Sequence, residues 1–263
     1  MENKSSNKLL KVLEFIVLKR QPLRLAEIAQ GTNINQSTVL RYLTALISNN
    51  YIKQDSETLK YSPTYKLKTL ANYIDIDQEL RSVARPYLLE LSKEFNESIC
   101  ISKEENMWSI YIDAIQSHHT LATFQKIGSL SPLHCTGNGK LLLLNYDADK
   151  LNQFISIRGL PRYTPYTITD KQKLVEELNK IRSRGYAYDN QERELGVRCI
   201  AFPVYNSQSK IIAGISVTGP INRMTDEFLQ SKIKYLKHAT EEISFKLGYN
   251  SFNLNVNDAI NCR

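Results

Sequence analysis

The sequence predicts an α+β protein in which a small helical domain with one β-hairpin precedes a larger domain around an antiparallel sheet. In residues 6–47, apolar side chains recur at three- and four-residue steps, which is the spacing of amphipathic helices. From residue 98 onward, short runs of β-branched and aromatic residues alternate with turn-forming residues and helical stretches, as in an α+β domain. A chain of 263 residues is long enough to give each part its own core.

Charge is unevenly distributed between the two predicted parts. Residues 1–75 hold 11 Lys and Arg against 6 Asp and Glu, whereas the remaining 188 residues hold 23 against 21. A small basic domain on a nearly neutral larger one is typical of nucleic-acid binding, because Lys and Arg neutralise phosphates.

The sequence indicates a cytoplasmic protein with no membrane partner. No apolar run approaches the roughly 18 residues that span a bilayer, and the N-terminus lacks the charged-then-apolar layout of a signal peptide. Its four cysteines are widely spaced, which argues against both a disulfide framework and a zinc ribbon.

Three helices are predicted in the small domain. Apolar residues at i, i+3, i+4 and i+7 predict a first helix over residues 6–20. A second short helix over residues 24–30 stops at a tight turn on Gly31, and a third begins with Asn35 as its N-cap and continues to residue 47.

The third helix carries a polar face suited to DNA. An amide, small hydroxyls and a guanidinium near a helix N-terminus are the groups that meet base edges and phosphates. Two short strands over residues 51–62 follow, and three helices plus a hairpin form a winged helix-turn-helix in residues 1–70. An amphipathic helix pair with a solvated polar face is the alternative. The predicted DNA contacts are Arg24, Gln36, Ser37, Thr38, Arg41, Tyr42, Thr44, Lys53 and Lys60.

A further helical stretch covers residues 76–95 and has a broad apolar stripe on both sides of Pro86. It is interpreted as part of a linker helix, residues 71–96, that joins the domains and pairs with its mate in a twofold dimer. Packing into the core of its own chain is the alternative.

The large domain is predicted to span residues 97–250, and the polar, patternless residues 251–263 form a tail. The predicted strands are residues 98–102, 108–114, 120–124, 186–189, 198–205 and 211–218, the last two forming a hairpin over residues 206–210. The predicted helices are residues 137–145, 149–156, 170–184 and 225–247.

Three motifs then point to a family. The first is LAEIA at residues 25–29 with STVLR at 37–41, the second is PLHCTGNGK at 132–140, and the third runs from GVRCIA at 196–201 to ISVTGP at 215–220. In this order and spacing, the chain resembles the IclR family of bacterial transcription regulators. The first motif occurs in many helix-turn-helix proteins, whereas the other two are specific.

The resemblance implies an effector-responsive regulator, expected here as a repressor. It implies a winged helix, a linker helix and a GAF-like domain that binds a small organic acid, with no cofactor or metal. It also implies a homodimer or a dimer of dimers on double-stranded, palindromic operator DNA.

The resemblance also assigns an effector site. Backbone N–H groups of Gly137 and Asn138 would bind a carboxylate, although many relatives carry a small apolar residue in place of Asn138. Its amide could therefore bind the ligand or narrow the pocket. Thr218 replaces a commoner serine. The remaining predicted effector contacts are Asp189, Cys199 and Ser216, with Thr120, Thr123 and Val197 as the wall.

Two other functional classes stay open at this stage. Cys199, His134 and Asp189 are the residue types of a thiol-based catalytic triad, so a cysteine-dependent enzyme is admissible. A metal-responsive regulator would instead use Cys135, His134 and Cys199, although these lack a local ligand spacing. Cys199 as one more buried apolar side chain is the simplest alternative.

Overall fold

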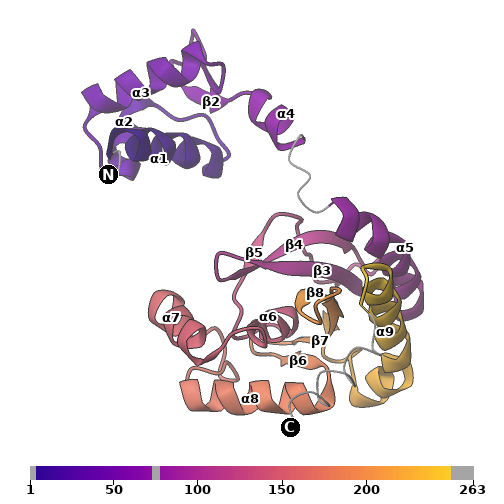
Figure 1. The fold of residues 1–263 in the computed structure, drawn as a ribbon. Coiled ribbons are helices and arrows are strands. Elements are labelled where there is room, and N and C mark those ends of the chain that lie inside the picture. The colour runs from indigo at the N-terminus through magenta and orange to yellow at the C-terminus, as the bar shows by residue number, and fades with distance from the viewer. Residues whose placement is uncertain (1–3, 73–77, 250–263) are drawn as a thin grey trace. The chain divides into compact units, whose positions relative to one another are not determined.

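The computed structural model describes residues 4–72 and 78–249. The chain divides into two compact units, residues 1–76 and 77–263. The predicted α+β class is confirmed, with a helix-turn-helix domain followed by an antiparallel-sheet domain (Figure 1). Linker residues 73–77 and the predicted tail lie outside the described residues.

Among the described residues, the N-terminal unit contains three packed helices, a two-stranded hairpin and a short fourth helix. Apolar side chains from all three helices form its core, with Val12 and Ile16 of the first helix and Val39 and Leu43 of the third fully buried. The elements are α1 (Lys4–Leu18), α2 (Leu25–Thr32), α3 (Gln36–Ser48), β1 (Ile52–Gln54), β2 (Tyr61–Pro63) and α4 (Lys66–Asn72).

The turn between α2 and α3 lies two residues beyond the predicted position. Gly31 is inside α2, and the left-handed residue that ends the helix is Asn33, with φ 57°. Gly31 instead lets α1 approach, because a Cβ there would lie 2.0 Å from the ring of Phe15. The Asn35 N-cap is confirmed, since its side chain accepts a hydrogen bond from the Thr38 N–H at 2.9 Å.

The second unit is built on a six-stranded sheet in the order β5-β4-β3-β8-β7-β6, with every neighbouring pair antiparallel (Figure 1). The hairpin between the last two strands turns over residues 206–210, as predicted. The strands are β3 (Ser98–Glu105), β4 (Trp108–Ile115), β5 (Leu130–Ser131), β6 (Ala187–Asn190), β7 (Val197–Tyr205) and β8 (Ile211–Pro220).

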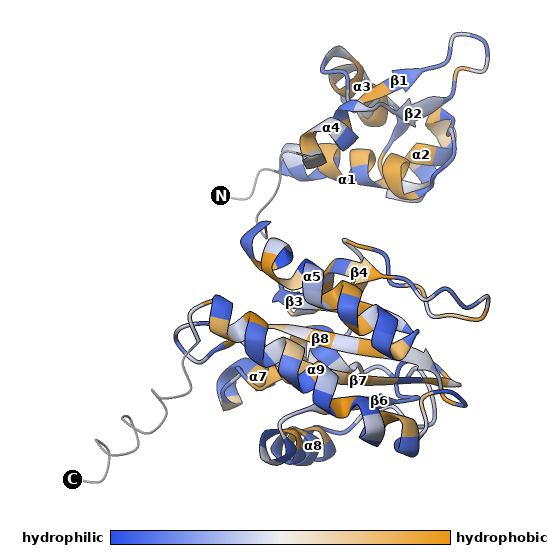
Figure 2. Ribbon diagram, turned by 90° about the vertical axis from the view of Figure 1, so that its right-hand side faces the viewer, coloured by the Kyte–Doolittle hydropathy of each residue, from blue (hydrophilic) through white to orange (hydrophobic). Residues whose placement is uncertain are grey.

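Helices cover both faces of this sheet. Two helices, α5 and α9, pack on one face over a core that includes Ile215 and Val217, and Figure 2 shows both in front of the strands. Because strand residues alternate in direction, Ser216 and Thr218 point to the opposite face, where α6 lies. The helices are α5 (Gln78–Phe95), α6 (Gly137–Leu143), α7 (Ala148–Arg158), α8 (Lys171–Arg184) and α9 (Asp226–Lys246).

The predicted linker helix corresponds to α5, which is a core element of the second unit. Its buried stripe, which includes Ala84, Leu88 and Leu91, packs with the sheet and α9. Pro86 lies inside this helix without ending it. Of the two interpretations of the stripe, packing within one chain is therefore the one that the structure contains. In the described part of the chain, no helix is long and apolar enough to cross a membrane.

The strand predicted at residues 120–124 is wrong. These residues form an irregular loop between β4 and β5, and Leu121 and Phe124 are exposed. Hydrogen bonds from distant residues hold the loop in place of a strand ladder. Ser98 Oγ donates to the Thr123 carbonyl at 2.7 Å, and Thr123 Oγ1 donates to the Thr218 carbonyl at 3.1 Å. An alternating pattern alone cannot distinguish such a loop from a strand.

Candidate functional site

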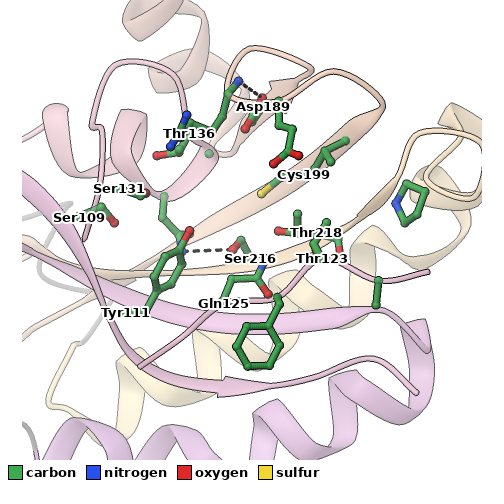
Figure 3. A pocket seen from close by; sticks show the side chains of 18 of the residues that line it. Ser109, Tyr111, Thr123, Gln125, Ser131, Thr136, Asp189, Cys199, Ser216 and Thr218 are labelled. Atoms are coloured by element: carbon green, nitrogen blue, oxygen red, sulfur yellow. Dashed lines mark hydrogen bonds between the residues drawn. The ribbon is translucent and has the colours of Figure 1, made fainter. Parts of the chain in front are cut away.

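A cavity of about 610 Å³ lies between the sheet and the start of α6. Strands β4, β6, β7 and β8 contribute to its wall, together with the loop at residues 121–125 and the loop at residues 193–196. Its size and its mixed polar and apolar lining suit a small organic molecule. Ten of its polar residues are labelled in Figure 3: Ser109, Tyr111, Thr123, Gln125, Ser131, Thr136, Asp189, Cys199, Ser216 and Thr218.

Strand register brings the most distant of these residues together. Thr218 of β8 pairs with Cys199 of β7, and Cys199 pairs with Asp189 of β6. The three residues form a row across the sheet, and all three line the cavity (Figure 3). The predicted effector residues thus lie in one place because of sheet pairing, which a local sequence pattern does not reveal.

Eight of the nine predicted effector residues line the cavity, and Thr120 does not. The loop residues that line the cavity are 121–125, and Thr120 lies just before them. The prediction that Thr120 forms part of the wall is therefore wrong. Sequence reasoning missed several lining residues. Ser109 and Tyr111 alternate along β4 and were identifiable from that periodicity, whereas Gln125, Ser131 and Arg193 carry no such signal.

The glycines at the start of α6 permit close packing. A Cβ at Gly137 would lie 3.0 Å from the Ala201 Cβ and 3.1 Å from the Cys199 Sγ, so glycine lets α6 approach β7. A Cβ at Gly139 would lie 2.5 Å from the backbone oxygen of Leu133. Gly139 therefore serves the tight turn that precedes the helix.

Asp189 is 5% exposed and is held by the backbone of the following loop. Its Oδ1 accepts hydrogen bonds from the N–H groups of Glu192 at 2.8 Å and Arg193 at 3.3 Å. Burial, reinforced by the neighbouring Glu192 and opposed by Lys140, raises the pKa of Asp189 to about 7. The carboxyl group therefore changes protonation near neutral pH, beside the cavity.

A buried ion pair holds the loop that follows Asp189, through Glu192. Lys140 of α6 is 1% exposed, and its Nζ contacts Glu192 Oε1. Glu177 lies 4.0 Å from the same ammonium and also pairs with Arg184 at 2.8 Å. The sequence placed Lys140 at the end of a motif without assigning this role.

The cysteine-dependent enzyme has no geometric support. Burial raises the pKa of the Cys199 thiol to about 12, so the nucleophilic thiolate is disfavoured. His134 Nε2 contacts the Pro161 carbonyl at 3.1 Å, where it must be the donor, and burial lowers its pKa. For the metal-responsive alternative, no group of three or more His, Cys, Asp or Glu suited to a metal occurs within the described ranges.

The polar face of α3 is the candidate nucleic-acid interface. Gln36, Ser37, Arg41 and Thr44 are exposed along it, and Thr38 is half-buried. Three further predicted contacts lie outside α3. Arg24 is exposed at the N-cap of α2, Lys53 is exposed on β1, and Lys60 is half-buried just before β2.

Tyr42 differs from its prediction as a DNA contact. Its side chain is 5% exposed and belongs to the core of the N-terminal unit. The spacing of Val39, Tyr42, Leu43 and Leu46 puts it on the apolar face of α3. Its hydroxyl lies 3.2 Å from Ser5 Oγ, and the Arg41 guanidinium lies over its ring at 5.5 Å, so Tyr42 supports Arg41 from within the domain.

Family models match both units of the chain. The IclR helix-turn-helix domain matches residues 7–56, and the C-terminal domain of the bacterial transcriptional regulator IclR matches residues 73–245. The transcriptional regulator KdgR of Escherichia coli K12 is 33% identical over 89% of this chain and 89% of its own length. Other matching relatives are named as repressors.

Solved structures agree with the fold. The Thermotoga maritima IclR structure covers 94% of this chain and 100% of its own, at 29% identity and a TM-score of 0.75. An IclR homolog from Microbacterium hydrocarbonoxydans, crystallised with 4-hydroxybenzoate, covers 93% of this chain and 99% of its own, at 20% identity and a TM-score of 0.78. The chain belongs to the IclR family of transcriptional regulators, which bind DNA and respond to effectors.

Proposed function

We propose that this regulator represses transcription by placing α3 on double-stranded operator DNA, and that a small carboxylic acid in the cavity controls this binding. The observation behind the proposal is that the same chain has an exposed α3 with hydrogen-bond donors in one unit and a cavity lined by polar residues in the other. Ser37, Thr38 and Arg41 would contact phosphates, and Gln36 and Thr44 would lie nearer the base edges. Operator binding places the protein in the cytoplasm.

The functional species is proposed to be a homodimer or a dimer of dimers. One short recognition helix makes few base contacts, so specificity requires a second copy on a palindromic site. Twofold symmetry would place two α3 helices about one turn of DNA apart.

Arg41→Ala is expected to weaken operator binding and to make it less sensitive to salt. A phosphate contact releases counterions, so its loss should reduce the slope of log affinity against log salt by about 1. Binding would be measured from low to moderate salt on an operator selected from random duplex DNA. Arg162→Ala, an exposed arginine of the second unit, is the matched control. An unchanged slope would remove Arg41 from the phosphate contacts.

A carboxylic acid is the favoured effector class. Hydroxyl, amide and backbone donors surround the cavity, and the homolog crystallised with 4-hydroxybenzoate supports an organic acid as the type of ligand. Thr218 and Asp189 lie on the row across the sheet and would contact the ligand directly. Thr123 and Val197 would form the wall.

A thermal-shift screen against glyoxylate, pyruvate, short sugar acids and aromatic acids is expected to give a ligand. At about 100 times its Kd, a ligand stabilises the protein by roughly 2.7 kcal/mol. Thr218→Val keeps the side-chain shape but removes a hydroxyl, and should weaken the affinity about tenfold through one lost hydrogen bond. Thr120→Val, outside the cavity, should leave the affinity unchanged. A screen without any shift would contradict acid sensing and leave DNA binding untouched.

A further inference from the structure

Along β8, the cavity ends at the side chain of Asn138. Alternate residues of β8 trace the cavity along the strand, since Pro220, Thr218 and Ser216 all line it. Gly214 is the next residue on the same face, and it is not part of the lining. Asn138, from the first turn of α6, covers this glycine and is 4% exposed.

The contact between Asn138 and Gly214 leaves no space behind the carboxamide. A Cβ at position 214 would lie 2.6 Å from Asn138 Oδ1 and 3.0 Å from its Cγ. A larger residue at position 214 would therefore force the Asn138 side chain to move. The β8 side of the cavity is therefore closed by a side chain and not by the sheet backbone, while Tyr111 continues the lining on the β4 side.

Asn138 also forms a hydrogen bond with the hydroxyl of Ser216. Its Nδ2 donates to Ser216 Oγ at 3.2 Å, which is the dashed line that reaches Ser216 in Figure 3. The same hydroxyl lies 3.0 Å from Cys100 Sγ, and Asn138 Nδ2 lies 3.8 Å from that sulfur. A hydroxyl has one proton and two lone pairs, so these two partners leave Ser216 one hydrogen-bonding position for a ligand.

This arrangement is unfavourable for stability. Asn138 Oδ1 is buried without a hydrogen-bond partner among the described residues. An unpaired buried polar atom loses its hydrogen bond to water on folding, which an apolar side chain of equal size would avoid. The amide at this position therefore points to a role beyond packing.

We propose that Asn138 determines the length of the acid that the cavity accepts. This inference rests on the proposed acid-sensing function. Its carboxamide blocks the β8 side of the cavity beyond Ser216 and holds the Ser216 hydroxyl. A small residue at position 138 would extend the cavity to Gly214 by the three heavy atoms of the amide and expose the Ser216 hydroxyl.

The test compares straight-chain 2-hydroxy acids of two to eight carbons by calorimetry. Asn138→Ala is expected to move the optimum length by two or three carbons and to tighten binding of the longer acids about 15- to 60-fold, since each buried CH₂ contributes about 0.8 kcal/mol. If the alanine variant does not fold, Asn138→Ser serves instead, because serine also shortens the side chain at this position. Asn138→Leu refills the space and should keep the original optimum.

A second readout follows Ser216. Ser216→Ala should change the affinity less than about twofold in the wild type, because Asn138 already holds this hydroxyl. In the Asn138→Ala background the same change should weaken binding about tenfold for an acid whose far end carries a hydroxyl group, as for a lost direct hydrogen bond. The straight alkyl chains, which offer Ser216 no hydrogen-bond partner, should not show this loss.

The outcomes separate the two proposals. Acids that bind with the same optimum in wild type and Asn138→Ala would overturn the role of Asn138 alone. Binding of no acid to any of these proteins would overturn the proposed effector class and this inference with it.

Discussion

Glu192→Ala is expected to destabilise the second unit by about 3–5 kcal/mol, the usual consequence of removing one partner of a buried ion pair. The ammonium of Lys140 is 1% exposed and would remain inside the protein without its closest carboxylate. Glu177 cannot replace that carboxylate, because it is 4.0 Å from Lys140 and already pairs with Arg184. The backbone carbonyl of Glu192, which accepts hydrogen bonds from Thr167, is unaffected by the change.

Urea unfolding at pH 7.5 would measure this effect. The only tryptophan of the chain, Trp108, lies in β4, so its fluorescence reports on the second unit. Glu241→Ala is the control, because its pair with Lys237 is exposed and contributes less than about 1 kcal/mol.

The double change of Lys140→Met with Glu192→Leu should recover much of the loss, because it removes both charges from the interior. A loss below about 1 kcal/mol in Glu192→Ala would show that water or another group compensates the ammonium.

Much of the fold was predictable because its signals are local. The helix predicted at residues 170–184 occurs as Lys171–Arg184, with Asp170 as a side-chain N-cap and Gly185 at its end. Both ends are set by residues adjacent in the chain. The loop at residues 120–124 was mispredicted, since the bonds that hold it come from Ser98, Thr218 and Arg223. Nothing in the local sequence specifies those partners.

The site was predictable to the extent that it follows strands and motifs. Alternation along β8 puts Ser216 and Thr218 on one face, and the resemblance to the family supplied Asp189 and Cys199. The Lys140–Glu192 pair joins residues 52 positions apart, and neither residue stands in a pattern that indicates the other. The hydrogen bond from Asn138 to the Ser216 hydroxyl likewise depends on how closely α6 packs against β8, and the local sequence does not indicate that distance.

Asp189→Asn is expected to make the second unit less sensitive to pH and more stable at pH 8. The pKa of Asp189 is about 7 in the folded protein, against about 3.9 in an unfolded chain. Between these values the folded state binds the proton more tightly, so its stabilisation is complete below pH 4 and is lost as pH rises through 7. Each unit of difference corresponds to about 1.4 kcal/mol, which gives up to roughly 4 kcal/mol at pH 8.

Comparing the asparagine variant with the wild type separates the effect of this carboxyl group from that of the neighbouring titratable groups. Its Oδ1 can still accept the hydrogen bonds from the Glu192 and Arg193 N–H groups, so the loop keeps its geometry. Burial also raises the pKa of Glu192 and lowers that of His134, but both groups are present in both proteins. The difference in unfolding free energy between variant and wild type should therefore increase from pH 5 to pH 8. Asp149→Asn, on the exposed start of α7, should show no such increase.

The same proton should couple to ligand binding. An anionic acid beside Asp189 would meet the carboxylates of Asp189 and Glu194, with Arg193 as the only cation among the described residues that line the cavity. Binding should therefore favour protonated Asp189 and take up a proton above pH 7. Wild-type affinity for an acid found by the screen should fall from pH 6 to pH 8, while Asp189→Asn should stay nearly constant. Equal pH dependence in both proteins would mean that ligand charge and Asp189 do not interact, and that the acid binds at the Thr218 end of the cavity, away from this carboxyl group.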